Sequence, residues 1–227
     1  MDFPRPPKAF TRKCLWLAPL ASLMMAMPAA ADVPQTRDMA DLSIEELANI
    51  QITSVSKRPE RLSGASASVF VITADDIRRS GAASTPEALR LAPNLNVAQS
   101  SAYDYAISAR GLNGSNNSSP NKLLVMINGR SVYTPLFSGV FWESQDLILE
   151  DIERIEVVSG PGGTLWGVNA VNGVVNIISR TAGQTEGTLA SVAAGTGGAE
   201  VGFRQGQRTA NGGWRLYGKY LDQRHTE

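Results

Sequence analysis

The stretch SGPGGTLWGVNAVNGVVNIISR runs from Ser159 to Arg180 and places five glycines and a proline between two apolar runs. A glycine-rich loop after a strand often holds a phosphate, because glycine lets the backbone approach a ligand closely. The runs IERIEVV before the loop and GVVNIIS at its end are rich in the β-branched residues that favour strands. Two interpretations therefore compete for this loop: a nucleotide site, or a set of tight turns between two strands.

The loop does not match the nucleotide-binding motifs. A P-loop needs G-x-x-x-x-G-K-[ST], and Val168 stands where the lysine is required. The dinucleotide fingerprint also fails, because Leu165 replaces its third glycine. Both motifs need a helix after the loop, whereas residues 172–179 are expected to form a strand. We therefore predict that the turn residues are structural; they are Gly160, Pro161, Gly162, Gly167 and Gly173.

The first 31 residues have the pattern of a secretory signal peptide. Basic residues between positions 5 and 13 precede an apolar run over 15–27, and three alanines at 29–31 offer a cleavage site. The alternative, a transmembrane anchor, needs about 20 apolar residues, which is more than this run supplies. We expect an exported protein whose mature chain starts near Asp32.

Composition argues against several chemical functions. Basic and acidic residues balance at 21 each, which gives no sign of nucleic-acid binding. Cys14 is the only cysteine and lies in the predicted signal peptide, and His225 is the only histidine. A catalytic triad, a thiolate metal site and a disulfide framework are therefore not supported, and we predict neither catalytic residues, nor a metal, nor a cofactor.

Local signals predict an alternation of strands and short helices. A strand over 68–72 should lead into a helix with Thr73 as N-cap, Asp76 at N3 and Gly81 at its end. A second short helix should have Thr85 as N-cap and Pro86 at N1. Further strands are expected over four ranges, with a turn at 128–130 after the third: 95–97, 107–110, 122–127 and 154–158.

Three alternating segments follow from Gly187. In the last of them Trp214, Leu216 and Tyr220 fall on one face, and Arg215 and Lys219 on the other. This period of two is typical of membrane β-barrel strands, and equally of a soluble antiparallel sheet. The pattern alone leaves both open, and the predicted export signal favours the barrel.

The stretch IERIEVVSGPGGTLWGVNAVNGVVNIISR closely resembles the plug-domain signature of TonB-dependent outer-membrane receptors. The segments VFVITADDIRRSGAASTPEALRLAPNLNV, ISARGLNG and LLVMINGRSVY are similar to earlier parts of the same domain, in the same order. The resemblance spans about residues 41–181. It implies an α+β plug with a small mixed sheet, lodged in a 22-stranded outer-membrane β-barrel of a Gram-negative bacterium.

This resemblance implies four regions. They are a signal peptide over 1–31, an N-terminal extension over 32–58, the plug over 59–181 and the first barrel strands over 182–227. Three strands cannot close a barrel, and open sheet edges are not tolerated in lipid. We therefore expect either the N-terminal part of a longer receptor or a truncated gene product. A periplasmic or surface binding module without transport is the alternative function.

The family mechanism implies a partner for the N-terminal extension. In these receptors the inner-membrane protein TonB pairs with a short segment, the TonB box, as an added strand and pulls on it. The segment IQITSVS precedes the plug and has β-branched residues that suit strand addition. Its residues are Ile50, Gln51, Ile52, Thr53, Ser54, Val55 and Ser56, and a simple linker is the alternative.

Two further sets of residues follow from the resemblance. Plug–barrel contacts are expected at Arg110, Gly111, Arg154 and Glu156; Ser159 replaces a second basic residue that the family usually carries before its Gly-Pro pair. Contacts to substrate, most commonly a ferric siderophore and next cobalamin, are expected at Tyr103, Asp104, Tyr105, Tyr133, Phe137 and Trp142. For Phe137 and Trp142, packing against the barrel wall is an equal alternative. Outer-membrane lipid would surround the strands.

Overall fold

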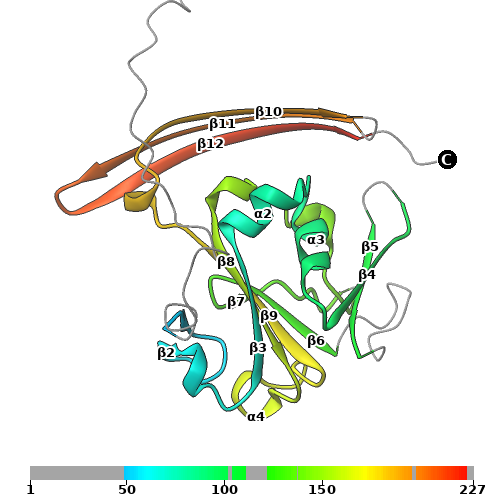
Figure 1. Cartoon of the computed structure of the whole chain (residues 1–227). Helices are drawn as coiled ribbons and strands as arrows, with labels where there is room; N and C mark the ends of the chain where they lie inside the picture. Colours follow the sequence, from blue (N-terminus) through cyan, green and yellow to red (C-terminus); the bar gives the residue numbers. More distant parts are fainter. Residues whose placement is uncertain (1–48, 102–103, 111–121, 137, 196–197, 224–227) are drawn as a thin grey trace, which may run out of the picture. The chain divides into compact units, whose positions relative to one another are not determined.

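A computed structural model describes residues 49–101, 104–110, 122–136, 138–195 and 198–223, all of which belong to one compact unit, Arg37–Glu227. Its centre is a five-stranded mixed sheet (Figure 1). The strands are β3 (Ser68–Thr73), β8 (Ile152–Ser159), β9 (Gly173–Ser179), β6 (Leu123–Ile127) and β7 (Arg130–Ser131), in this spatial order. Only β6 and β9 run parallel, and the other neighbours are antiparallel. The predicted mixed sheet is confirmed.

Helix α2 (Ala74–Ser80) has the ends that the sequence predicts. The Thr73 hydroxyl accepts from the Asp76 backbone N–H, and the Asp76 carboxylate accepts in return from the Thr73 N–H. Gly81 ends the helix in the left-handed region at φ 69°. This capping box satisfies backbone groups that a helix leaves unpaired at its start.

Helix α3 (Thr85–Ala88) begins one residue earlier than expected. Ser84, not Thr85, is the N-cap, and neither side chain caps the helix. The Glu87 carboxylate instead accepts from the backbone N–H of Ala83, and Thr85 is buried. The 3₁₀ turn η3 (Leu89–Leu91) continues the chain from this helix. In the part of the chain described above, no helix has the length and apolar character needed to cross a membrane.

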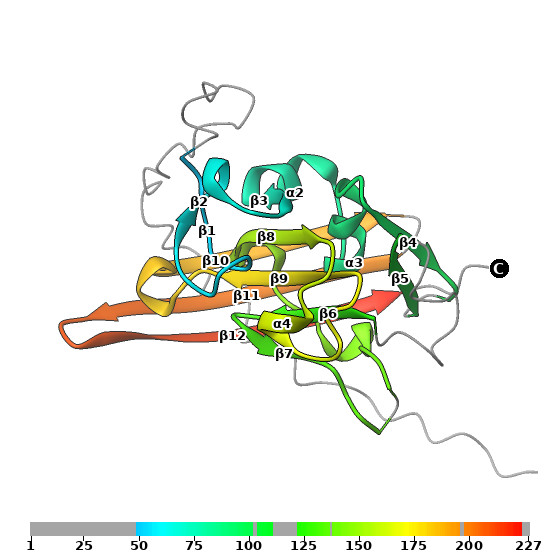
Figure 2. The same cartoon turned by 90° about the horizontal axis from the view of Figure 1, so that it is seen from below.

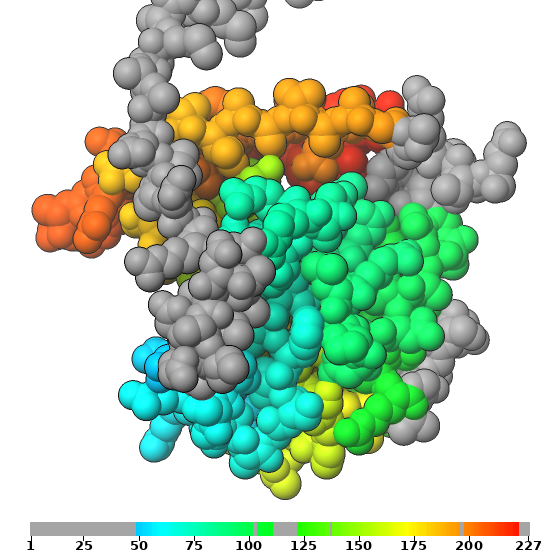
Figure 3. All heavy atoms as spheres, in the orientation of Figure 1, coloured from blue at the N-terminus to red at the C-terminus, as the bar shows by residue number. Residues whose placement is uncertain are grey.

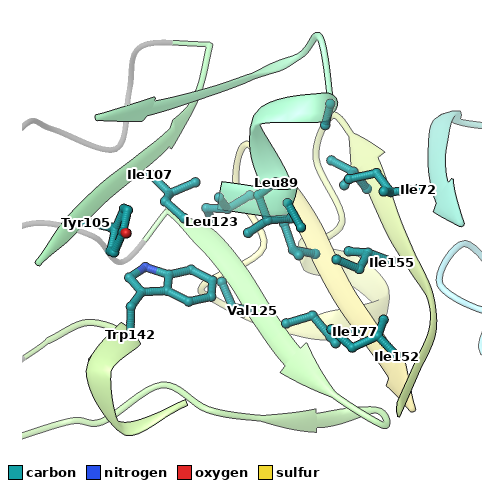
Figure 4. Packing of buried hydrophobic residues seen from close by; sticks show 14 of the residues in the cluster. Ile72, Leu89, Tyr105, Ile107, Leu123, Val125, Trp142, Ile152, Ile155 and Ile177 are labelled. Carbon is teal, nitrogen blue, oxygen red and sulfur yellow. The ribbon is translucent and has the colours of Figure 1, made fainter. Parts of the chain in front are cut away.

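The main hydrophobic core lies between these helices and one face of the sheet (Figure 4). Ile77 of α2 and Leu89 of η3 pack against a layer of apolar side chains on the strands. Its fully buried members include Ile72, Ile152, Ile155, Val157, Val175 and Ile177. Each buried aliphatic side chain contributes about 1.5–3 kcal/mol to folding, so this layer fixes the plane of the sheet.

The opposite face of the sheet has a different cover. A second cluster contains Leu124, Met126, Val158, Val174 and Ala170, and its partly buried neighbours include Val55 and Trp166. Those two side chains come from the segment before the first long strand and from the glycine stretch. The N-terminal segment is therefore part of the packing of the sheet, and Figure 2 shows its strands β1 (Gln51–Ile52) and β2 (Glu60–Arg61) beside this domain.

Shorter elements complete the domain. The hairpin of β4 (Leu95–Gln99) and β5 (Tyr105–Ala109) stands apart from the main sheet. Four 3₁₀ turns connect the longer elements: η2 (Leu62–Gly64), η4 (Trp142–Ser144), η5 (Leu149–Asp151) and η6 (Ala182–Gln184). The predicted turn after β6 has Asn128 and Gly129 at φ 51° and 76°, as a tight hairpin turn requires.

The glycine stretch contains one element that the sequence did not reveal. A single helical turn, α4 (Gly163–Trp166), lies between β8 and β9, where we expected only loop. Gly160 and Gly167 adopt positive φ angles of 113° and 92°, which other residues rarely reach. Gly173 serves close packing, because a Cβ there would lie 2.5 Å from the Val158 carbonyl oxygen. The helical turn carries Trp166 towards the N-terminal segment.

The last three strands form a separate antiparallel sheet: β10 (Gly187–Gly195), β11 (Gly198–Thr209) and β12 (Gly212–Gln223). Val192, Phe203, Leu216 and Tyr220 are exposed on it, whereas Arg204 is buried on the side of the plug. A soluble sheet would bury its apolar face. The apolar outer face and polar inner face match the alternation expected of barrel strands.

Candidate functional site

The segment Ile50–Ser56 begins as a strand that pairs locally. Gln51 and Ile52 of β1 lie opposite Arg61 and Glu60 of β2, and the Leu62 N–H donates to the Ile50 carbonyl at 2.9 Å. Ile52 is fully buried. In Figure 3 this start of the described chain, in blue and cyan, lies at the surface of the domain.

From Thr53 onward the segment is not extended, contrary to our expectation. Residues Thr53 to Lys57 form a compact turn, in which the Lys57 N–H donates to the Thr53 carbonyl at 3.0 Å. Lys57 closes the turn at a positive φ of 59°. The β-branched residues indicated a strand, but the side chains that surround this stretch hold it in another conformation.

The main contact of this turn is the carboxylate of Glu156, in the middle of β8. One oxygen accepts from the backbone N–H groups of Thr53 at 2.9 Å and Ser54 at 2.8 Å. The other oxygen accepts from Arg154 Nε at 2.9 Å. Glu156 is fully buried, and a buried carboxylate is tolerated only when charge and hydrogen bonds compensate it, as they do here.

Trp166 of α4 holds the same turn from a second direction. Its indole N–H donates to the Ser54 carbonyl at 2.9 Å. The ammonium of Lys57 lies 4.6 Å from the centre of the indole ring, within cation–π range. Ser54 is fully buried between these groups. We call Glu156, Arg154 and Trp166 the anchor site.

A cavity of about 780 Å³ opens beside the anchor site. Four of its lining residues are basic and one is acidic: Lys57, Arg154, Arg180, Arg215 and Glu153. Arg154 also pairs with Glu153, so part of this charge is compensated. Among the described residues, no group of acidic, histidine or cysteine side chains could hold a metal ion.

The plug contacts the β10–β12 sheet through charged pairs that the sequence did not reveal. Asp151 of η5 binds Arg204, and its second oxygen lies 3.1 Å from Arg215. Lys219 lies 2.8 Å from Asp146 and 3.1 Å from Glu200. The alternation in the last segment places Arg215 and Lys219 on one face, which is the signal that could have identified them.

For the four residues expected to contact the barrel, that contact stays a prediction. Arg154 and Glu156 face the N-terminal turn, and Gly111 lies outside the described residues. Arg110 is exposed with a positive φ of 56°, and its guanidinium lies beside Gly160. Ser159, where the family usually has a basic residue, accepts a hydrogen bond from the side-chain amide of Asn94.

Two of the aromatic residues expected to contact substrate are core residues. Tyr105 and Trp142 are buried in the main cluster, and Figure 4 shows both rings within it. The Tyr105 hydroxyl accepts from Ser84 and donates to Glu87, and burial raises the pKa of this phenol. Burial leaves neither ring open to a substrate, which corrects that expectation.

The other expected substrate contacts are only partly covered by the structure. Asp104 ends the loop of the β4–β5 hairpin, where its backbone N–H donates to the Ser101 hydroxyl at 3.2 Å and its carboxylate accepts from the Ser100 hydroxyl at 3.0 Å. Tyr133 follows β7, and its backbone N–H donates to the Ser131 hydroxyl at 3.3 Å. Tyr103 and Phe137 lie outside the described residues. For these four residues substrate contact stays a prediction.

Comparison with known proteins gives a consistent picture. A family model described as the TonB-dependent receptor plug domain matches residues 61–174. The vitamin B12 transporter BtuB of Vibrio vulnificus is 29% identical over 165 residues, which cover 71% of this chain and 26% of that protein. BtuB of Photobacterium profundum is 30% identical over 172 residues, covering 73% and 26%.

Solved structures share the fold. The ferripyoverdine receptor of the outer membrane of Pseudomonas aeruginosa superimposes with a TM-score of 0.57 at 17% identity, over 76% of this chain and 22% of that one. At this identity the match concerns the fold alone. The chain thus spans about a quarter of the length of the curated relatives it matches.

Proposed function

This chain belongs to the TonB-dependent receptor plug family, and from that premise we propose that it serves active uptake of a scarce nutrient across the outer membrane. A ferric siderophore or cobalamin is the proposed cargo. The similarity to two vitamin B12 transporters supports cobalamin, and the ferric siderophore follows from the family resemblance, of which it is the commonest cargo. In this proposal the strands β10–β12 belong to the wall of the barrel, in contact with lipid.

The plug is proposed to close the lumen until TonB, powered by the inner-membrane proton gradient, displaces it. The proposed attachment point is the segment Ile50–Ser56. One observation carries this assignment: individual side chains of the plug hold the segment, and among the described strands it pairs only with the two-residue β2. Such contacts can be exchanged for a new strand, as β-augmentation requires.

Thr53 provides a direct test of this assignment. Thr53→Pro removes a backbone N–H that an added strand would need, whereas Thr53→Ala keeps it. We expect Thr53→Pro to abolish uptake of radiolabelled cyanocobalamin or of a radiolabelled ferric siderophore, and Thr53→Ala to retain most of it. The assay uses the native protein in its host, with and without TonB.

The outcomes separate the components of the proposal. Unchanged uptake by Thr53→Pro would remove the segment from the mechanism. Uptake that is equal with and without TonB would overturn the function itself. Binding of cargo without any uptake would favour a binding module, and the cargo that is transported identifies the substrate class.

A further inference from the structure

Docking and strand addition compete for the same backbone groups. In the docked turn, Glu156 occupies the N–H groups of Thr53 and Ser54, and Trp166 occupies the Ser54 carbonyl. The carbonyl groups of Ile50 and Thr53 are bonded to Leu62 and Lys57. An added strand pairs through these same main-chain groups. The segment therefore cannot bind a strand partner while it stays docked.

We propose that Glu156 is the positioning residue that sets how readily the segment Ile50–Ser56 leaves the plug, with Trp166 as its helper. This inference rests on the proposed function, because it concerns the same segment. Beyond that function, it identifies the plug residues that compete with the partner strand for the backbone groups of the segment. Glu156 and Trp166 touch neither the partner nor the cargo; they act by holding the segment.

Glu156 is suited to a reversible contact. Its second oxygen keeps the bond to Arg154 whether or not the segment is present, since both residues lie on β8. Departure of the segment exposes the carboxylate to water, so the remaining charge is paired and hydrated. A hydrophobic contact of similar strength would instead leave an apolar surface open.

The anchor site also connects the segment to two different parts of the plug. Glu156 lies on β8, which pairs with both β3 and β9, and Trp166 lies on α4 in the glycine stretch. Glu156 binds the adjacent residues Thr53 and Ser54, and Trp166 binds Ser54. A partner that pulls on the segment would thus act first on the centre of the sheet and on the loop between β8 and β9.

The test measures docking directly, through a cysteine at Ser54. This residue is fully buried, and its hydroxyl has no hydrogen-bond partner among the described residues, so Ser54→Cys adds a thiol that reacts only after the turn opens. Replacement of Cys14 by serine makes the new thiol the only one in the 227 residues. The rate of maleimide labelling of the native protein reports the opening.

Glu156→Gln should raise the labelling rate about ten-fold or more, because charge-assisted hydrogen bonds are about twice as strong as neutral ones. Trp166→Phe keeps an aromatic ring but loses the indole N–H together with the pyrrole part of the ring, and should raise the rate about five-fold. The matched control is Glu153→Gln, which also loses a bond to Arg154 but none to the segment, and should stay within about two-fold.

The result that overturns the inference is an unchanged labelling rate in both Glu156→Gln and Trp166→Phe, or an equal rise in Glu153→Gln. The last outcome would indicate general loosening of β8. A failure of the proposed function looks different: labelling rises as expected, yet neither the parent nor Glu156→Gln binds the isolated TonB C-terminal domain. If both proposals hold, Glu156→Gln binds that domain more tightly, by the factor by which its labelling rises.

Discussion

Replacement of Gly173 by alanine tests the structural interpretation of the glycine stretch. Gly173 begins β9 and lies opposite Ser159 of β8 and Leu123 of β6. A Cβ at this position would lie 2.5 Å from the Val158 carbonyl oxygen and 3.3 Å from Leu123 Cδ1. The nearer atom is backbone at the centre of the sheet, so it cannot rotate away as a flexible side chain would.

The expected cost follows from what must move. Overpacking of a buried site costs about 1–3 kcal/mol, because neighbouring backbone shifts out of its favoured geometry. A shift of Val158 also weakens a hydrogen bond of the β8–β9 ladder, worth about 0.5–1.5 kcal/mol. The lower chain entropy of unfolded alanine returns about 0.4–1 kcal/mol. We therefore expect the free energy of unfolding to fall by about 2 kcal/mol.

The assay is urea unfolding of the native protein, followed by tryptophan fluorescence. Gly64→Ala is the matched control, because a Cβ there meets no atom within 4 Å and its φ is not positive. It should leave stability unchanged or raise it by about 0.4–1 kcal/mol. If Gly173→Ala unfolds within about 0.5 kcal/mol of the parent, the close approach of β8 and β9 is not what requires glycine.

Two other predictions concern Asp151, whose ion pairs the sequence did not reveal, and Tyr105, which was expected to contact substrate but is buried. Asp151→Asn leaves the largely buried Arg204 and Arg215 without their carboxylate, and should lower the free energy of unfolding by about 3–5 kcal/mol in the same urea titration. The control is Asp146→Asn, after which Lys219 still has Glu200 as a partner. It should lower the free energy of unfolding by less than about 1 kcal/mol. Because burial raises the pKa of Tyr105, its neutral form stabilises the fold fully below the unfolded pKa of about 10, and this contribution is lost as pH rises above that value. The difference in the free energy of unfolding between the parent and Tyr105→Phe should therefore become smaller above a pH of about 10. A difference that does not change with pH would contradict this explanation.

Elements with local signals were predictable from sequence. Thr73, Asp76 and Gly81 fix both ends of α2, and Asn128 with Gly129 fixes the turn after β6. Each signal acts within a few residues of the element it defines. The helical turn α4 has no such signal: neither end has a side-chain cap, and it depends on bonds such as that from the Gly162 N–H to the Ala170 carbonyl.

The anchor site could be predicted only in part. The sequence identified Glu156 and the segment Ile50–Ser56 separately, but nothing in either indicates the other, because the bonds that join them span about a hundred positions. Alternation along β8 places Glu156 on one face without showing what covers that face. The same reasoning explains Tyr105 and Trp142, whose aromatic rings suit a substrate surface and a core equally well until their neighbours are known.

At the contact between the plug and strands β10–β12, carboxylates on the plug pair with cations on the strands. The family resemblance predicted barrel contacts at Arg110 and Arg154, and those contacts stay predictions. In the structure the carboxylates Asp146 and Asp151 lie on the plug, and the cations Arg204, Arg215 and Lys219 lie on the strands. At the Gly-Pro turn, Ser159 accepts a hydrogen bond from Asn94 within the plug, and the guanidinium of Arg110 lies beside Gly160. The described ion pairs between the plug and these three strands therefore do not involve position 159.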